Sequence, residues 1–277
     1  MRVYISADME GTAAVCSWSQ VDPSNVHEYP IYRRNMTREV RAAIDGAREG
    51  GAGDFLINDS HWDMRNLVWD ELPSGVRLIT GNRKPFSMVQ GAEQRCDAAF
   101  FTGYHARVGE ADATLAHTYS SDTLYDVRVN GTPCTEALLN AAVLGHYGTP
   151  VVLVTGDRAT VDSVSRSLPW ITGVVVKDSI GYYSVNSLTP AAACEAIREG
   201  ARDALRSLEH AKPFSFEAPI ELVVETAKTE QADVMELLPA VSRIGARAVS
   251  FHHDDYLTVF RMFLAITRIG AAASLPA

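Results

Sequence analysis

Two acids follow the first apolar run of the chain, in the stretch SADMEG at residues 6–11. If residues 3–7 form a strand, Asp8 and Glu10 are two positions apart in extended backbone, so both side chains leave on the same face. Two negative charges side by side at the end of a buried element repel each other and lose hydration. A bound cation would offset both effects and keep the two acids ionised.

Two further apolar runs end in polar clusters that contain histidine. The run at residues 54–58 leads into His61, and the run at residues 98–102 leads into His105. Ligands of open α/β sheets collect outside the carboxyl ends of the strands, so parallel neighbouring strands would bring two carboxylates and two imidazoles together. These side chains suit zinc, manganese or iron, and the lack of cysteine in the cluster favours a catalytic site over a structural zinc site.

Each of these residues also has a purely structural explanation. A single acid after a strand commonly caps a turn or a helix, and we expect Asp59 to cap the next helix. Glu136 lies in the first turn of an expected helix and His146 near its end, where the helix dipole favours them. The spacing assigns His117 no role. It is the coincidence of three strand ends that favours a metal site.

Other motifs are explained by local structure. In the run HHDD at residues 252–255, neighbouring side chains of an extended segment point to opposite faces, so the four cannot all bind one ion. We expect a strand end there that caps the last helix. The stretch GDRATVDS at residues 156–163 is interpreted as a strand-to-helix turn rather than an anion site. No GxGxxG, GxxxxGK(S/T) or GxSxG motif occurs, so dinucleotide binding, a phosphate loop and a serine-hydrolase elbow are unsupported.

Alternating strand and helix patterns in the first two-thirds of the chain predict an α/β fold with a three-layer, mostly parallel sheet. The Asn-Gly pair at residues 130–131 favours a hairpin over residues 123–134. A Gly-Gly pair at residues 50–51 would end the first long helix. The expected elements are strands at 3–7, 54–58, 76–80, 98–102 and 150–155 and helices at 32–49, 135–146 and 190–208.

The pattern changes from about residue 213. Strands in PIELVVET (219–226) and in ARAVSFHHDD (246–255) alternate with helices at 232–238 and from Tyr256 onward. This β-α-β-α unit predicts a smaller α+β lobe. The expected division is an α/β metal-binding catalytic domain of residues 1–210 and a lobe of residues 211–277.

The composition is that of a soluble globular protein, with 47% hydrophobic and 21% charged residues. The net charge of −9 and the lack of basic runs disfavour nucleic acid and anionic membranes as partners. The start of the chain lacks the plan of a signal peptide, no apolar stretch approaches the roughly 18 residues of a spanning helix, and the four cysteines lie far apart. We therefore expect a cytoplasmic protein without nucleic-acid or membrane partners.

Six motifs, in order and with similar spacing, resemble the D-aminopeptidase family typified by the bacterial dipeptide-operon aminopeptidase. The resemblance runs from residue 1 to about residue 190 and more loosely to the end. The motifs are SADMEG (6–11), NDSH (58–61), KPFSM (84–88), GYHA (103–106), the histidine at 117 and TEALLNA (135–141).

The resemblance implies a two-zinc aminopeptidase acting on short peptides, with manganese or cobalt as substitute metals. It implies that Asp8 bridges the two ions, that Glu10 and His61 complete one site, and that His105 and Glu136 complete the other. Glu136 thereby becomes a ligand through the family alone, since its position in a helix favours only the dipole explanation.

The resemblance also implies that His117 is the catalytic base or proton shuttle near the metals. It implies a self-compartmentalising homodecamer of two stacked pentameric rings. Lys84 and Arg107 are candidates for binding a substrate carboxylate or an oxyanion.

One departure concerns the pattern Gly-Glu-x-Gly-x-Asn around the helical ligand, which is TEALLN at residues 135–140 here. Both glycines are replaced by larger residues, which leaves the preference for D-residues open. Two other functions use the same sheet edge: a different two-metal amidohydrolase or phosphoesterase, and a non-catalytic peptide-binding component of a transport system. The presence of all five expected metal ligands disfavours the transport component, because a protein that only binds peptides does not need an open site for two metal ions.

Overall fold

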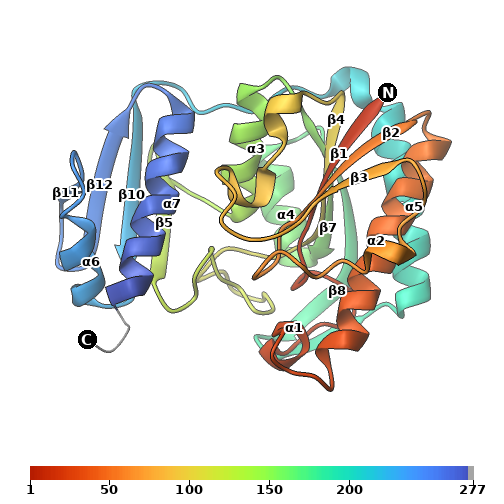
Figure 1. Cartoon of the computed structure of the whole chain (residues 1–277), viewed down its shortest axis with the longest axis horizontal. Helices are drawn as coiled ribbons and strands as arrows, with labels where there is room; N and C mark the ends of the chain where they lie inside the picture. Colours follow the sequence, from red (N-terminus) through yellow and green to blue (C-terminus); the bar gives the residue numbers. More distant parts are fainter. Residues whose placement is uncertain (274–277) are drawn as a thin grey trace.

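The computed structural model describes residues 1–273, in which two β-sheets are joined by helices (Figure 1). The larger sheet has the strand order β3-β2-β1-β4-β7-β8-β9. Its neighbouring strands are parallel up to β8, and β9 pairs antiparallel with β8 at the edge. These strands are β1 (Arg2–Ala7), β2 (Asp54–Asp59), β3 (Val76–Ile79), β4 (Ala98–Tyr104), β7 (Val151–Asp157), β8 (Thr172–Gly181) and β9 (Ser184–Ser187).

Helices cover both faces of this sheet, which confirms the expected three-layer α/β fold. Helices α2 and α5 pack together on one face, and α3 and α4 lie on the other (Figure 1). On β1, Val3 and Ile5 pack toward α2 and α5, whereas Tyr4 belongs to the core on the opposite face. Because both faces are buried, the strand is apolar almost throughout rather than at alternate positions.

The helices have the following bounds. The α-helices are α1 (Trp18–Val21), α2 (Tyr29–Glu49), α3 (Glu136–His146), α4 (Arg158–Ser167), α5 (Pro190–Arg206), α6 (Thr229–Met235) and α7 (Tyr256–Ala273). The short 3-10 helices are η1 (Trp69–Glu71), η2 (Ser87–Val89), η3 (Ala92–Gln94) and η4 (Leu208–His210).

The smaller sheet is antiparallel and has the order β11-β12-β10-β5-β6. Its β5–β6 hairpin turns at Asn130 and Gly131, both with positive φ angles (51° and 75°), as the Asn-Gly pair predicts. β5 and β6 precede residue 210, so C-terminal strands complete this sheet rather than form it alone. A domain division at residue 210 stays a prediction. The strands are β5 (Leu124–Val129), β6 (Thr132–Pro133), β10 (Ile220–Thr226), β11 (Ser242–Arg243) and β12 (Ala248–His253).

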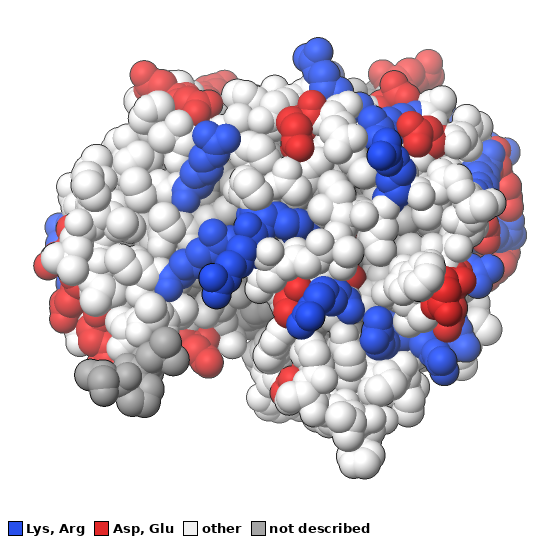
Figure 2. Space-filling view, viewed as in Figure 1, with Lys and Arg blue, Asp and Glu red and all other residues white. Residues whose placement is uncertain are grey.

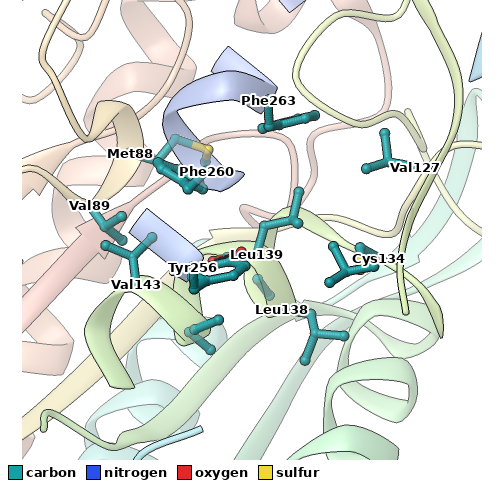
Figure 3. Close-up of a cluster of buried hydrophobic side chains, with 14 of the residues drawn as sticks. Met88, Val89, Val127, Cys134, Leu138, Leu139, Val143, Tyr256, Phe260 and Phe263 are labelled. Carbon is teal, nitrogen blue, oxygen red and sulfur yellow. Dashed lines mark hydrogen bonds between the residues drawn. The ribbon is translucent and has the colours of Figure 1, made fainter. Parts of the chain in front are cut away.

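The last helix, α7, joins the two sheets through a shared core. Phe260 and Phe263 of α7 pack in this core with residues of α3 such as Leu139 (Figure 3). The Tyr256 hydroxyl donates a hydrogen bond to the Leu139 carbonyl at 2.8 Å. By length and composition alone α7 passes the test for a membrane-spanning helix, contrary to the expectation from the sequence. Core helices pass the same test, and α7 packs on α3, α6, β10 and β12.

Several elements differ from those expected. α2 begins at Tyr29 rather than residue 32, with Pro30 in its first turn, where the missing N–H removes no helical hydrogen bond. α1 lies between the first expected strand and the first expected helix, where no helix is expected. The β8–β9 hairpin is absent from the expectation, because Lys177 and Asp178 interrupt its apolar run. Pairing with β7 nevertheless makes β8 a strand of the sheet.

Candidate metal-binding site

The three strand ends meet at one edge of the larger sheet. β1 lies between β2 and β4, and Ala7 is paired with Asp59 of β2 and with Thr102 of β4. The loops that follow therefore start at the same level, and the first turn of α3 joins them. The five residues expected to bind metal converge here, each at most 3% exposed: Asp8, Glu10, His61, His105 and Glu136.

Two glycines let the loops after β1 and β4 touch. The Gly11 amide donates a hydrogen bond to the Gly103 carbonyl at 2.8 Å. A Cβ atom on Gly11 would lie 1.9 Å from the Tyr104 carbonyl oxygen. A Cβ atom on Gly103, whose φ is +67°, would lie 2.3 Å from the Asp8 carbonyl oxygen. Because neither position has room for a side chain, both glycines are needed to bring His105 to the acids after β1.

The orientation of His61 leaves one ring nitrogen for a cation. Its Nε2 lies 2.8 Å from the Val21 carbonyl oxygen, which only accepts, so Nε2 carries hydrogen. Nδ1 faces Glu10 Oε2 at 3.0 Å and Asp8 Oδ1 at 3.3 Å. Burial opposes a charged ring, but the Glu10 carboxylate outweighs it and holds the pKa of His61 well above its usual value. Nδ1 thus faces both acids, where a bound metal ion would balance their charges.

His105 is oriented in the same way. Its Nδ1 donates a hydrogen bond to the Ala106 carbonyl at 2.9 Å. Its Nε2 faces Asp8 Oδ2 at 3.5 Å and Glu136 Oε1 at 3.4 Å. Burial again opposes the charged ring, and the Glu136 carboxylate outweighs it and raises the pKa of His105 to about 10. Metal-binding histidines usually have their second nitrogen fixed by a carbonyl or carboxylate, as both rings do here.

The protein does not provide a hydrogen-bond donor for every carboxylate oxygen of the site. Among residues 1–273, Asp8 Oδ2 is buried without a hydrogen-bond partner, whereas Oδ1 accepts from the Met9 amide at 2.9 Å. Burial, followed by the charge of Glu10, raises the pKa of Asp8 to about 7. Burial also acts to raise the pKa of Glu10, but the His61 charge outweighs it and holds that pKa well below the usual range. A bound cation would satisfy this buried carboxylate oxygen.

His117 enters the cluster from the loop between β4 and β5. Its Nδ1 donates to the Leu115 carbonyl at 2.8 Å, and its Nε2 lies 3.8 Å from Glu10 Oε1 and 3.9 Å from Glu136 Oε1. The ring stacks on His105 with 3.9 Å between the centroids. Burial and the His105 charge lower the pKa of His117 and so favour its neutral form. No strand or helix periodicity in the sequence identifies His117 as a residue of the site.

Two overlapping groups of donor atoms have the spacing of a metal site, with all donors of a group within 4.8 Å of one another. His61 adds a third nitrogen at the distances given above. Nitrogen and carboxylate oxygen without thiolate are the ligands of catalytic zinc and manganese sites, so the residues fit such a metal. The two groups are Asp8 with Glu10 and His105, and His105 with His117 and Glu136.

Lys177 of β8 supports the loop that carries Glu10. Its buried ammonium donates hydrogen bonds to three carbonyl oxygens of this loop, those of Glu10, Thr12 and Val15. Glu39 of α2 accepts from the Ala13 amide at 2.8 Å. Burial lowers the pKa of Lys177 to about 8 and raises the pKa of Glu39 to about 7. Neither residue carries a sequence signal, because the contacts join the loop after β1 to α2 and β8.

Two expected substrate contacts are not found among the residues that line the cavity. The Lys84 ammonium is buried and donates to Asn58 Oδ1 at 2.7 Å and to the Asp59 carbonyl at 2.6 Å. Arg107 forms salt bridges with Glu110 at 3.1 Å and with Asp126 at 3.6 Å. Both side chains have protein partners, so they stabilise loops rather than face a ligand.

Two capping expectations have different outcomes. Asp59 does not cap a helix; its carboxylate accepts hydrogen bonds from the Asn66 and Leu67 amides and orders the loop after β2. Asp255 does cap α7, because its carboxylate accepts from the Thr258 amide at 2.9 Å. The difference arises because the chain after β2 turns into a loop that no short-range pattern predicts.

A cavity of about 590 Å³ opens beside the candidate ligands. Aromatic and sulfur-containing side chains form much of its wall, among them Trp18, Trp62 and Met88. α7 forms another part of the wall, so the helix that packs on the smaller sheet also shapes this site. The sequence predicts neither the cavity nor the contribution of α7.

The fold and the site together define a metal-binding α/β protein with the donor set of zinc hydrolases. Residues 1–265 match the sequence profile of the D-aminopeptidase family, peptidase family M55. The chain belongs to this family, which confirms the resemblance of its motifs. It is 33% identical to a D-aminopeptidase of Bacillus subtilis (strain 168) over 278 residues, 99% of each chain.

A solved structure is also closely similar. It is described as the Zn-dependent D-aminopeptidase DppA from Bacillus subtilis, a self-compartmentalizing protease. The two folds agree with a TM-score of 0.94 at 32% identity, and the match covers 100% of both chains.

Proposed function

We propose that this protein is a zinc-dependent aminopeptidase that removes N-terminal D-amino acids from short peptides. The observation that carries the proposal is the position of Asp8, whose two carboxylate oxygens face different histidines, His61 and His105. A carboxylate placed in this way can bridge two ions. Membership of the D-aminopeptidase family and the zinc dependence ascribed to the similar Bacillus protein support the reaction.

The proposal includes two zinc ions per subunit, with manganese and cobalt as expected substitutes. Asp8 is shared, Glu10 and His61 complete one site, and His105 and Glu136 complete the other. When bound, zinc supplies Lewis acidity that activates water and polarises a carbonyl group. The remaining chemistry falls to side chains of the protein.

His117 is the proton-transfer group of the proposed reaction. Because its Nδ1 donates to the Leu115 carbonyl, Nε2 is free to accept a proton from water and to release it to the leaving amine. Burial lowers the pKa of His117, which favours the unprotonated form of the ring. The stacked ring of His105 and the edge of Trp18, 5.1 Å away between centroids, hold the imidazole in one orientation.

The loss of the two family glycines is compatible with D-residue substrates. Thr135 caps α3 by accepting a hydrogen bond from the Leu138 amide at 3.0 Å. Leu138 is buried in the core shared by the two sheets. Neither side chain is among those that line the cavity, so their added bulk does not occupy the space available to a substrate.

We also propose a homodecamer of two pentameric rings that encloses its active sites in the cytoplasm, with peptides as partners and neither nucleic acid nor membrane. The self-compartmentalizing character of the similar Bacillus protein supports this assembly. Native mass spectrometry should give ten copies of the 30.2 kDa chain. A monomer or dimer at micromolar concentration would contradict it, and cell fractionation tests the location.

The proposed activity is tested with metal analysis and with matched D- and L-aminoacyl p-nitroanilides. We expect two zinc ions per chain and faster release from the D-series. Asp8→Asn should reduce both zinc content and turnover, whereas Asp45→Asn, a half-exposed position on α2, should change neither. A protein that binds no metal, or stays inert with zinc, manganese and cobalt on both series, would refute the proposal.

A further inference from the structure

The wall that α7 contributes to the cavity follows one face of the helix. Leu264, Thr267, Arg268 and Ala271 line the cavity, and their spacing of three, one and three residues places them on one side. Leu264 is 5% and Thr267 is 7% exposed, whereas Arg268 is exposed. The face therefore runs from buried positions to an exposed arginine at the edge of the cavity.

Arg268 is the one Lys or Arg among the described residues that line this cavity. Within residues 1–273 its guanidinium has neither a hydrogen bond nor a salt bridge, unlike Arg107, which pairs with Glu110 and Asp126. Arg261, about two turns earlier on α7, covers the ring of Phe86 at 5.1 Å and does not line the cavity. An unpaired guanidinium at the mouth of a cavity is available to an anionic ligand.

Basic side chains also gather on one face of the molecule (Figure 2), although the chain carries a net charge of −9. Figure 2 shows Lys and Arg side chains gathered over the middle of one face, where α7 meets the part of the molecule built on the larger sheet. Such a local field raises the concentration of anions near the opening.

We propose that Arg268 binds the C-terminal carboxylate of the peptide whose N-terminal residue lies at the metal ligands. This inference rests on the proposed aminopeptidase function and adds a determinant of specificity to it. A guanidinium offers two parallel N–H donors that match the two oxygens of a carboxylate. The carboxylate is the one group that every unmodified short peptide carries at the end opposite its free amine.

A fixed cation at the opening also selects peptide length. An extended chain advances about 3.3–3.6 Å per residue, so only peptides whose length matches the span from the metal ligands to Arg268 place the carboxylate on the guanidinium. Longer peptides, and peptides ending in an amide, lose this contact. The protein therefore favours free-carboxylate peptides of one short length over their amides.

The test compares D-alanine peptides of two, three and four residues, each as the free acid and as the C-terminal amide. For the best length we expect the wild-type protein to prefer the acid by about tenfold in kcat/KM, as one charge-assisted interaction provides. Arg268→Met should abolish that preference mainly through KM, and Arg268→Lys should restore part of it. Arg261→Met removes a cation from the same helix and should leave the acid-to-amide ratio unchanged.

A binding measurement keeps the inference testable apart from turnover. Calorimetric titration of the zinc-supplemented protein uses the same acid and amide pair with the scissile carbonyl replaced by methylene. We expect the acid to bind about tenfold more tightly, and Arg268→Met to remove the difference. Equal binding of acid and amide, or a preference that survives in Arg268→Met, overturns the role of Arg268. Loss of hydrolysis with retained carboxylate-dependent binding instead refutes the proposed reaction alone.

Discussion

The buried ammonium of Lys177 should be necessary both for stability and for metal affinity, and Lys177→Met is the change that tests this. Methionine has a similar length but donates no hydrogen bond, so the carbonyl oxygens of Glu10 and Val15 lose their buried donor. The Thr12 carbonyl keeps only the hydrogen bond from the Val15 amide at 3.2 Å. The substitution also removes the positive charge near the buried carboxylate of Glu39.

The magnitude follows from the number of groups left unsatisfied. Each buried acceptor without a donor costs about 1–3 kcal/mol, so two unsatisfied acceptors and the loss of the favourable charge near Glu39 reduce the free energy of unfolding by roughly 4 kcal/mol, near the upper end for single substitutions. For a chain of this size that corresponds to a fall in Tm of about 8–15 °C. Because the loop also carries the Glu10 ligand, we expect zinc affinity to fall by roughly 10–100-fold, as for other residues that orient metal ligands.

Thermal unfolding of the metal-free protein measures the first effect, and competition with a zinc-binding dye measures the second. Lys228→Met is the matched control, because Lys228 lies on the surface and pairs with Glu230 at 3.7 Å. The reasoning is refuted if Lys177→Met lowers Tm no more than the control does, or if the destabilised protein keeps wild-type zinc affinity.

Three further perturbations have expected outcomes. His117→Gln should retain zinc and lose roughly 10²–10⁴-fold in kcat, as for a general acid–base group; loss of zinc in this variant would instead make His117 a ligand. Gly11→Ala should prevent assembly of the site, because its Cβ would lie 1.9 Å from the Tyr104 carbonyl oxygen, and soluble protein with normal zinc content would contradict this close approach. Burial raises the pKa of Glu39 from 4.5 to about 7, so the folded state binds the proton more tightly and loses stability as pH rises through that range. Denaturant titrations at pH 5 and pH 8 should therefore show Glu39→Gln gaining up to about 3 kcal/mol over wild type with rising pH, and a pH-independent difference would show that Glu39 does not titrate there.

Much of the candidate site can be predicted from short-range patterns in the sequence. Asp8 and Glu10 share a face because extended backbone has a period of two, and the apolar runs before His61 and His105 identify buried strands. Parallel strands have their carboxyl ends at one edge, so these residues could be expected to meet before any coordinates were known. The Asn-Gly turn of β5–β6 and the cap at Asp255 are likewise local, since their hydrogen bonds span only a few residues.

Other parts of the site depend on contacts between distant segments. Glu136 looks like an ordinary first-turn acid until the packing of α3 directs its carboxylate to His105, and only the family resemblance identified it from the sequence. His117 has no periodic signal, because a loop places it. Lys177 lies in a strand whose apolar pattern it interrupts, and its three acceptors are more than 160 residues away. Arg268 reaches the cavity because α7 packs between the two sheets. Sequence periodicity thus determined which residues leave each strand together, whereas tertiary packing alone decided which charges they meet, because electrostatic partners are set by distance in space.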